Sequence, residues 1–144
     1  MELERRGAQR IRRGYAEENQ SGLTGAIIGG AMKVHSALGP GLLESAYEAC
    51  LCRELAKAKI EFRRQVPMPI EYDGFKLDCG FRLDLVVEGK VVVEIKAVDQ
   101  VLPLHESQLL TYLKISAIPL GLILNFNVSH LKNGIYRKVQ RPAL

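Results

Sequence analysis

Residues 81–98 of the chain read FRLDLVVEGKVVVEIKAV and predict the centre of the fold. Two runs rich in β-branched residues, 81–87 and 91–98, flank the short sequence Glu-Gly-Lys, a pattern typical of a β-hairpin. The second run is apolar enough for a central strand that is buried on both faces. We therefore expect this hairpin to lie at the centre of a β-sheet.

The segments on either side of the hairpin predict helices and further strands. Apolar residues recur every three or four positions on both sides of Gly39-Pro40-Gly41, as in helices that bury one face. The glycines and the proline interrupt the helical period between them. A strand with two prolines then leads to a turn signal at Asp73-Gly74. We expect helices over 23–38, 42–59 and 103–116, and strands over 60–72, 81–87, 91–98, 119–127 and 134–140. The order α-α-β-β-β-α-β-β predicts a mixed α+β (α/β) domain with a central sheet flanked by helices.

The composition is that of one folded domain. The chain has 144 residues, 47% of them hydrophobic and 25% charged, which excludes an intrinsically disordered protein. Residues 1–20 have mixed charge and no sustained apolar period, so we expect a flexible charged tail before a single domain over 21–144. No apolar run approaches the roughly 20 residues of a membrane span, and no secretory signal is recognisable. With three cysteines in no metal-binding spacing, we expect a cytoplasmic protein with reduced, buried thiols.

Basic residues gather near the two ends of the sequence. The net charge is only +4, but five arginines lie within residues 5–13 and no acidic residue follows Glu106. Such clusters attract nucleic acid by releasing counterions from its phosphates. A solvated basic surface explains the same charges, so charge permits a nucleic-acid partner without establishing one.

Three polar residues stand where a buried hairpin should be apolar. Glu94 and Lys96 lie two residues apart in the second strand and therefore on one face. Asp84 lies opposite Glu94, on that same face, if the hairpin is centred on Gly89. A strict two-residue turn would instead place Asp84 opposite Val93, on the other face. A shared site thus requires an odd loop or a bulge between the strands.

This charged group suggests metal chemistry. Two neighbouring carboxylates repel each other, and a divalent cation such as Mg²⁺ relieves that repulsion. A lysine beside them can orient an attacking water or stabilise charge that develops on a phosphate. Glu44, on the stripe of Tyr47 at the start of the second helix, would reach toward the same metal. An ordinary ion-pair cluster is the alternative for the hairpin residues, and a favourable charge at a helix N-terminus is the alternative for Glu44.

The third predicted helix offers two further polar side chains. Gln108 and Tyr112 are four residues apart and therefore face the same way. They would present an amide and a phenol to a backbone phosphate or to Lys96. The alternative is a surface glutamine above a half-buried tyrosine, and the spacing alone does not separate the two.

The run Gly41-Leu42-Leu43-Glu44-Ser45-Ala46-Tyr47, preceded by Gly39-Pro40, resembles the signature of the GxxExxY protein family. These proteins are placed in the PD-(D/E)XK nuclease superfamily. The resemblance extends from about residue 23 to residue 139 and includes the segments 82–85, 93–97, 105–113 and 121–126. It implies a restriction-endonuclease-like core.

The resemblance also implies roles for individual residues. Leu83 stands where the superfamily name has proline, at a position that carries no chemistry. The implied metal ligands are Asp84 and Glu94, with Lys96 as the catalytic lysine. Glu44 matches the acidic residue that the superfamily carries on its own first helix, and Gln108 and Tyr112 match a substrate-binding QxxxY element.

Two functions of different classes follow. The first is a nuclease that depends on Mg²⁺ or Mn²⁺ and hydrolyses phosphodiester bonds of DNA, with RNA as the secondary substrate. The second is a non-catalytic nucleic-acid-binding module or complex subunit that retains the nuclease fold. A domain of this size leaves little room for specificity elements, which favours a homodimer or a protein partner.

Overall fold

The computed structural model describes residues 22–141, so the predicted charged tail lies outside the described residues. A helix over 22–38 is followed by α2 (Glu44–Lys57). Five strands come next: β1 (Phe62–Pro67), β2 (Ile70–Tyr72), β3 (Phe75–Leu77), β4 (Arg82–Val87) and β5 (Val91–Lys96). The remaining elements are α3 (Pro103–Ser116), β6 (Leu120–Asn125), the 3₁₀ helix η1 (Leu131–Gly134) and β7 (Ile135–Val139).

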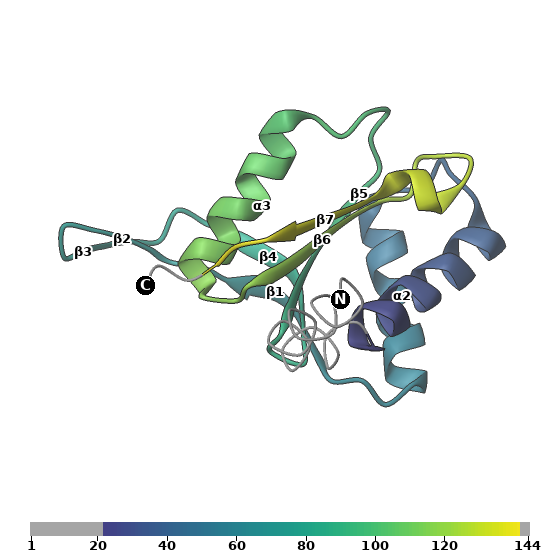
Figure 1. Cartoon of the computed structure of the whole chain (residues 1–144), viewed down its shortest axis with the longest axis horizontal. Helices are drawn as coiled ribbons and strands as arrows, with labels where there is room; N and C mark the ends of the chain where they lie inside the picture. The colour runs from purple at the N-terminus through teal and green to yellow at the C-terminus, as the bar shows by residue number, and fades with distance from the viewer. Residues whose placement is uncertain (1–21, 142–144) are drawn as a thin grey trace, which may run out of the picture.

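The central sheet has the strand order β1-β4-β5-β6-β7. β5 and β6 are parallel and are joined through α3, whereas the other neighbours are antiparallel. The helix over 22–38 and α2 lie against one face of this sheet, and α3 lies against the other (Figure 1). The predicted fold class, a mixed sheet flanked by helices, is therefore confirmed.

The element order differs from the prediction by two strands. The range 60–72 divides into β1 and β2, and residues 75–77 form β3, which pairs with β2 in a separate hairpin. Pro67 and Pro69 lie at the division because proline donates no hydrogen bond to a sheet. The turn at Asp73-Gly74 has positive φ at both residues, as the sequence signal predicted. In Figure 1 this hairpin projects away from the central sheet.

The Gly39–Gly41 loop is held in place by Tyr47. The Tyr47 hydroxyl donates to the Gly39 carbonyl at 2.6 Å and accepts from the Leu42 amide at 3.0 Å. Its ring stacks on Phe126, with ring centroids 4.5 Å apart and an interplanar angle of 9°. Gly39 and Gly41 have positive φ, which other residues rarely adopt. The tyrosine of the Gly41–Tyr47 run therefore has a structural role in joining the first helix to α2.

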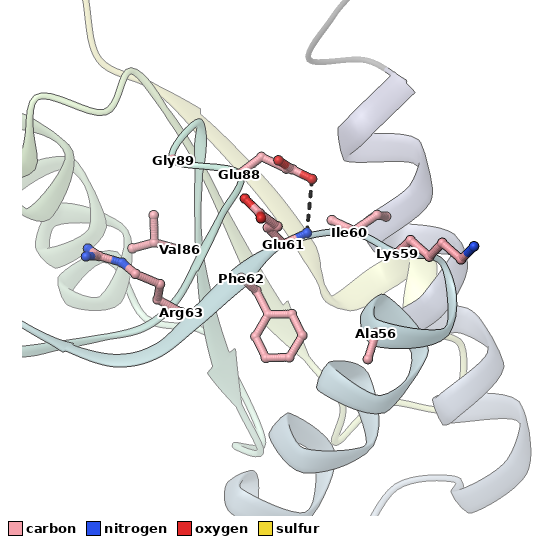
Figure 2. Close-up of a pocket in the computed structure, with 9 residues that line it drawn as sticks. All are labelled: Ala56, Lys59, Ile60, Glu61, Phe62, Arg63, Val86, Glu88 and Gly89. Atoms are coloured by element: carbon pink, nitrogen blue, oxygen red, sulfur yellow. Dashed lines mark hydrogen bonds between the residues drawn. The ribbon is translucent and has the colours of Figure 1, made fainter.

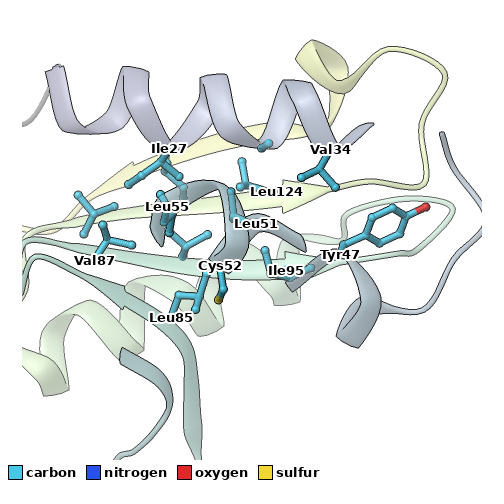
Figure 3. Packing of buried hydrophobic residues seen from close by; sticks show 14 of the residues in the cluster. Ile27, Val34, Tyr47, Leu51, Cys52, Leu55, Leu85, Val87, Ile95 and Leu124 are labelled. Carbon is cyan, nitrogen blue, oxygen red and sulfur yellow. The ribbon is translucent and has the colours of Figure 1, made fainter. Parts of the chain in front are cut away.

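The hydrophobic core has a part on each side of the sheet. Figure 3 shows the larger part, in which α2 residues such as Leu51 and Leu55 pack on strand residues such as Leu85 and Ile95. The smaller part packs α3 on Val86, Val92 and Ile123. Among residues 22–141, no helix has both the length and the apolar composition needed to cross a bilayer.

The cysteines are free thiols, but they are not all buried. Cys52 is buried in the core, Cys50 is half-buried and Cys79 is exposed in the connection between β3 and β4. The prediction of three buried thiols is therefore wrong for Cys79, because its segment belongs to the projecting hairpin rather than to the core. Burial raises the pKa of the Cys52 thiol to about 11.

Candidate active site

The β4–β5 register brings Asp84 and Glu94 together. Val87 lies opposite Val91 and Leu85 lies opposite Val93, so three residues, 88–90, separate the paired positions. This is the odd loop that a shared carboxylate site requires. Continued by one residue, the same register places Asp84 opposite Glu94.

At this position hydrogen bonds to side chains replace the backbone hydrogen bonds between β4 and β5. The Asp84 amide donates to Glu94 Oε1 at 3.3 Å, and the Ile95 amide donates to Asp84 Oδ2 at 2.8 Å. Each carboxylate therefore binds the backbone of the opposite strand. The two acids are fixed next to each other at the point where the backbone pairing of β4 and β5 ends.

Lys96 shares the face of Glu94. Val92, two residues before Glu94, packs with α3, whereas Val93 and Ile95 pack with α2 and the first helix. Since side chains alternate along a strand, Val92, Glu94 and Lys96 point to the α3 side of the sheet. Glu94 and Lys96 thus lie on one face, as the sequence predicted, and Asp84 is joined to the Glu94 position by the two hydrogen bonds described above.

Burial dominates the electrostatics of this pair. Glu94 is 6% exposed, and the pKa of its carboxyl group is raised to about 9. Desolvation is the largest cause and the neighbouring charge of Asp84 contributes to the rise, whereas the charge of Lys96 opposes it. Without a cation Glu94 is therefore protonated at neutral pH. A bound cation would favour its ionised form.

Tyr112 and Gln108 approach the site from α3. Burial raises the pKa of the Tyr112 phenol, and the charges of Glu94 and Asp84 add to this shift, which places the phenol close to the pair. Gln108 and Tyr112 together line a groove between α3 and the base of the β2–β3 hairpin. The predicted common orientation of these two side chains is confirmed.

Glu44 contacts the chain directly after Lys96, at the end of β5. Its Oε1 accepts from the Ala97 amide at 3.4 Å, just beyond the end of β5. The expectation that it follows the buried stripe of Tyr47 is wrong, since Glu44 is exposed while Tyr47 is buried. As the first residue of α2, it stands at the rim of the packed face and bridges to the strand end instead.

A second acid of α2 was missed by the sequence reasoning. Glu48 is 6% exposed, and Arg64 Nη2 donates to its Oε2 at 2.9 Å. Gln65 Nε2 donates to Glu48 Oε1 at 2.8 Å and to Asp84 Oδ1 at 3.5 Å. A signal was present, because Glu48 shares a helical stripe with the buried Leu51 and Leu55.

Gln65 has an unusual backbone for a strand residue. Its φ is +49°, in the left-handed region, although it lies within β1. Its neighbours Arg64 and Val66 pair with Leu85 and Leu83 of β4. It is therefore opposite Asp84, and its amide connects Asp84 to Glu48. Such strain costs about 1–3 kcal/mol and gathers at functional sites. Nothing in the sequence marked Gln65.

A wider hollow lies away from this site. It encloses about 720 Å³ beside the start of β1 and the β4–β5 turn, where the Glu61 amide donates to Glu88 Oε1 at 3.0 Å (Figure 2). The turn is at the opposite end of β4 from Asp84, so this hollow is not part of the carboxylate site.

One comparison with known proteins identifies the family. A family model described as the PD-(D/E)XK nuclease superfamily matches residues 21–138. The chain belongs to this superfamily. Comparisons with curated proteins and with solved structures gave no match. The narrower likeness to GxxExxY proteins, carried by the Gly41–Tyr47 run and by the further segments between residues 82 and 126, stays a prediction.

The residues of this PD-(D/E)XK domain suit a divalent metal only in part. Within the described range 22–141, no group of three or more His, Cys, Asp and Glu side chains is arranged to hold a metal ion. The adjacent carboxylates of Asp84 and Glu94 are nevertheless the hard oxygen donors that Mg²⁺ and Mn²⁺ prefer, and Mg²⁺ commonly binds one or two carboxylates together with waters. The buried, mutually repelling pair thus fits such an ion.

Proposed function

We propose that this protein is a metal-dependent nuclease that hydrolyses phosphodiester bonds, with DNA as the primary substrate and RNA as the secondary one. The observation that carries the proposal is the contact between Asp84 and Glu94, with Lys96 on the same face, in a chain of the PD-(D/E)XK nuclease superfamily. Folding alone does not explain a buried acid beside another acid. A role in phosphodiester hydrolysis explains why the two acids lie together.

Asp84 and Glu94 would hold a Mg²⁺ or Mn²⁺ ion, with Glu44 supporting it from the end of β5. When bound, the ion supplies positive charge to the phosphate oxygens and to the two carboxylates. The hydrogen bonds from the Ile95 and Asp84 amides keep both acids oriented toward each other. Gln65 adds a positioning contact to Asp84 from β1.

Lys96 would provide the cationic group of the reaction. Its ammonium lies on the face of the carboxylate pair, where it can orient the attacking water by hydrogen bonding. The same charge stabilises the negative charge that develops on the phosphate in the transition state. Gln108 and Tyr112, on the facing helix, would position the substrate backbone through their amide and hydroxyl groups.

Basic residues after Glu106 would contribute affinity for the polyanion. Lys114 is exposed on α3, whereas Lys138 pairs with Glu106 at 2.7 Å. Contacts of free basic side chains with phosphates make binding weaker as the salt concentration rises. We expect this dependence whether or not the bound strand is cleaved.

The test uses single-stranded DNA, duplex DNA and RNA, each with Mg²⁺, Mn²⁺ or EDTA. The variants are Glu94→Gln and Lys96→Ala, and Glu61→Gln is a matched control because Glu61 is an exposed glutamate at the start of β1. We expect metal-dependent cleavage by the wild type and by Glu61→Gln, and its loss in the two site variants. Cleavage near the wild-type rate in Glu94→Gln would contradict the mechanism. Binding without cleavage by the wild type would favour the non-catalytic module.

A further inference from the structure

The groove beside the carboxylate pair is lined in part by Gln108 and Tyr112, but its apolar walls have no role in the chemistry described above. It encloses about 260 Å³ between α3 and the base of the β2–β3 hairpin. Met68 and Phe81 line one side, and Tyr112 and Ile115 line the other. Phe81 is 39% exposed and Ile115 is 38% exposed, so these apolar walls are open to solvent.

The walls suit a flat, aromatic group with a polar edge. The rings of Phe81 and Tyr112 form a tilted aromatic contact, with centroids 6.3 Å apart and an interplanar angle of 59°, and the 39% exposure of Phe81 leaves part of its ring open to the groove. One ring face can therefore receive a planar ligand in an offset stack. Gln108 also lines the groove, and its amide offers both donors and an acceptor.

The groove and the carboxylate pair are neighbours. Phe81 precedes Asp84 by three residues, which along a strand is about 10 Å. Tyr112 borders both places, since it lines the groove and its phenol is affected by the charges of Glu94 and Asp84. A group bound in the groove would therefore lie close to a phosphodiester held at the pair.

We propose that this groove binds one unstacked base of the strand being cleaved, so that the substrate is single-stranded or locally unpaired nucleic acid. This inference rests on the proposed nuclease function. The groove is smaller than the roughly 300 Å³ lower limit of pockets for drug-sized ligands, which suits one base and not a base pair. A base inside a duplex is covered on both faces by its neighbours and cannot stack on a side chain unless it leaves the helix.

The experiment measures equilibrium binding of the full chain in EDTA, where metal-dependent cleavage does not occur. The probes are a short single-stranded DNA, its duplex, and a strand of the same length without bases. Phe81→Ala removes one wall, and Ser107→Trp fills the groove from an exposed position on α3. Leu43→Ala is the control, because Leu43 is 77% exposed and lies before α2.

We expect the wild type and Leu43→Ala to bind the single strand about tenfold more tightly than the duplex or the baseless strand, as expected for stacking of one base. Phe81→Ala and Ser107→Trp should bind the single strand only as tightly as the baseless one. Because one variant enlarges the groove and the other fills it, a shared loss with unchanged thermal unfolding indicates the groove and not misfolding.

Three results would overturn the inference: duplex binding as tight as single-strand binding, equal binding of the baseless strand, or unchanged binding by both groove variants. Absence of measurable binding by the wild type would overturn it as well. Failure of the nuclease proposal is distinguishable, because groove-dependent binding without cleavage in Mg²⁺ or Mn²⁺ would contradict only the catalytic function. Cleavage that is unaffected by Phe81→Ala and Ser107→Trp would contradict only the groove.

Discussion

Replacing Glu94 by glutamine should stabilise the metal-free protein at neutral pH while removing its activity. The pKa of the Glu94 carboxyl is raised from 4.5 to about 9, first by burial and then by Asp84. Between these two values the unfolded chain is ionised at Glu94 while the folded chain is protonated. Each pH unit in this window therefore lowers the free energy of unfolding by about 1.4 kcal/mol.

The size of the effect follows from that window. Relative to a chain whose residue 94 does not titrate, the free energy of unfolding of the wild type is lower by up to about 4 kcal/mol at about pH 7.5. At about pH 5 the difference is less than about 1 kcal/mol. Glutamine has nearly the same shape and keeps an oxygen that can accept from the Asp84 amide. The free energy of unfolding of Glu94→Gln minus that of the wild type should therefore increase by up to about 3 kcal/mol when the pH is raised from the lower to the higher of these two values.

Urea unfolding in EDTA at the two pH values measures this difference, with Glu61→Gln as the control for an exposed glutamate. A saturating divalent cation should then stabilise the wild type at the higher pH but not Glu94→Gln, because only the carboxylate binds the ion strongly. If the stability difference between wild type and Glu94→Gln were the same at both pH values, Glu94 would not be a buried acid with a raised pKa. The reasoning about the site would then fail.

Three further predictions concern single positions. Lys96→Met should lower the cleavage rate at least about hundredfold with little change in the urea midpoint, because it removes a cation that acts on the transition state; an unchanged rate would exclude Lys96 from the reaction. Gln65→Gly should be more stable than Gln65→Ala by about 1 kcal/mol in urea, since both lose the side-chain amide but only glycine adopts a φ of +49° without strain; equal stabilities would contradict the strain. Gly134→Ala should lower the free energy of unfolding by about 3 kcal/mol in thermal unfolding, because its Cβ would clash with the Asn125 carbonyl oxygen. Gly25→Ala in the first helix should raise it by about 0.5–1 kcal/mol, because its Cβ would meet no atom of the described residues within 4 Å.

Local chemistry made most of the fold predictable. The 81–98 hairpin, the Gly39–Gly41 interruption and Pro103 at the start of α3 each act within a few residues, and each element appears where its pattern placed it. The division of 60–72 into β1 and β2 could not be deduced, because it depends on pairing with β4 and not on the prolines alone. The hairpin turn at Asp73-Gly74 was predicted, but the strand β3 after it was overlooked, since three-residue strands carry almost no periodic signal.

The candidate site was predictable only for residues that lie on one strand or on two paired strands. Glu94 and Lys96 follow from the two-residue period, and Asp84 follows from the register once the loop length is known. No local sequence pattern indicates the contacts between α2 and β1. Glu48 therefore went unnoticed although it is buried, and Glu44 was assigned its place on the core face.

The features that oppose folding gather at one place. Glu94 is a buried acid with an acid neighbour, Glu48 is a second buried acid that needs Arg64, and Gln65 holds a left-handed backbone within a strand. Elsewhere in the described chain, the buried side chain without a hydrogen-bond partner is the hydroxyl of Thr24. A chain selected for stability alone would replace these residues, because each replacement by a well-packed apolar side chain removes a cost of folding. Their concentration around Asp84 therefore supports the candidate site independently of the family match.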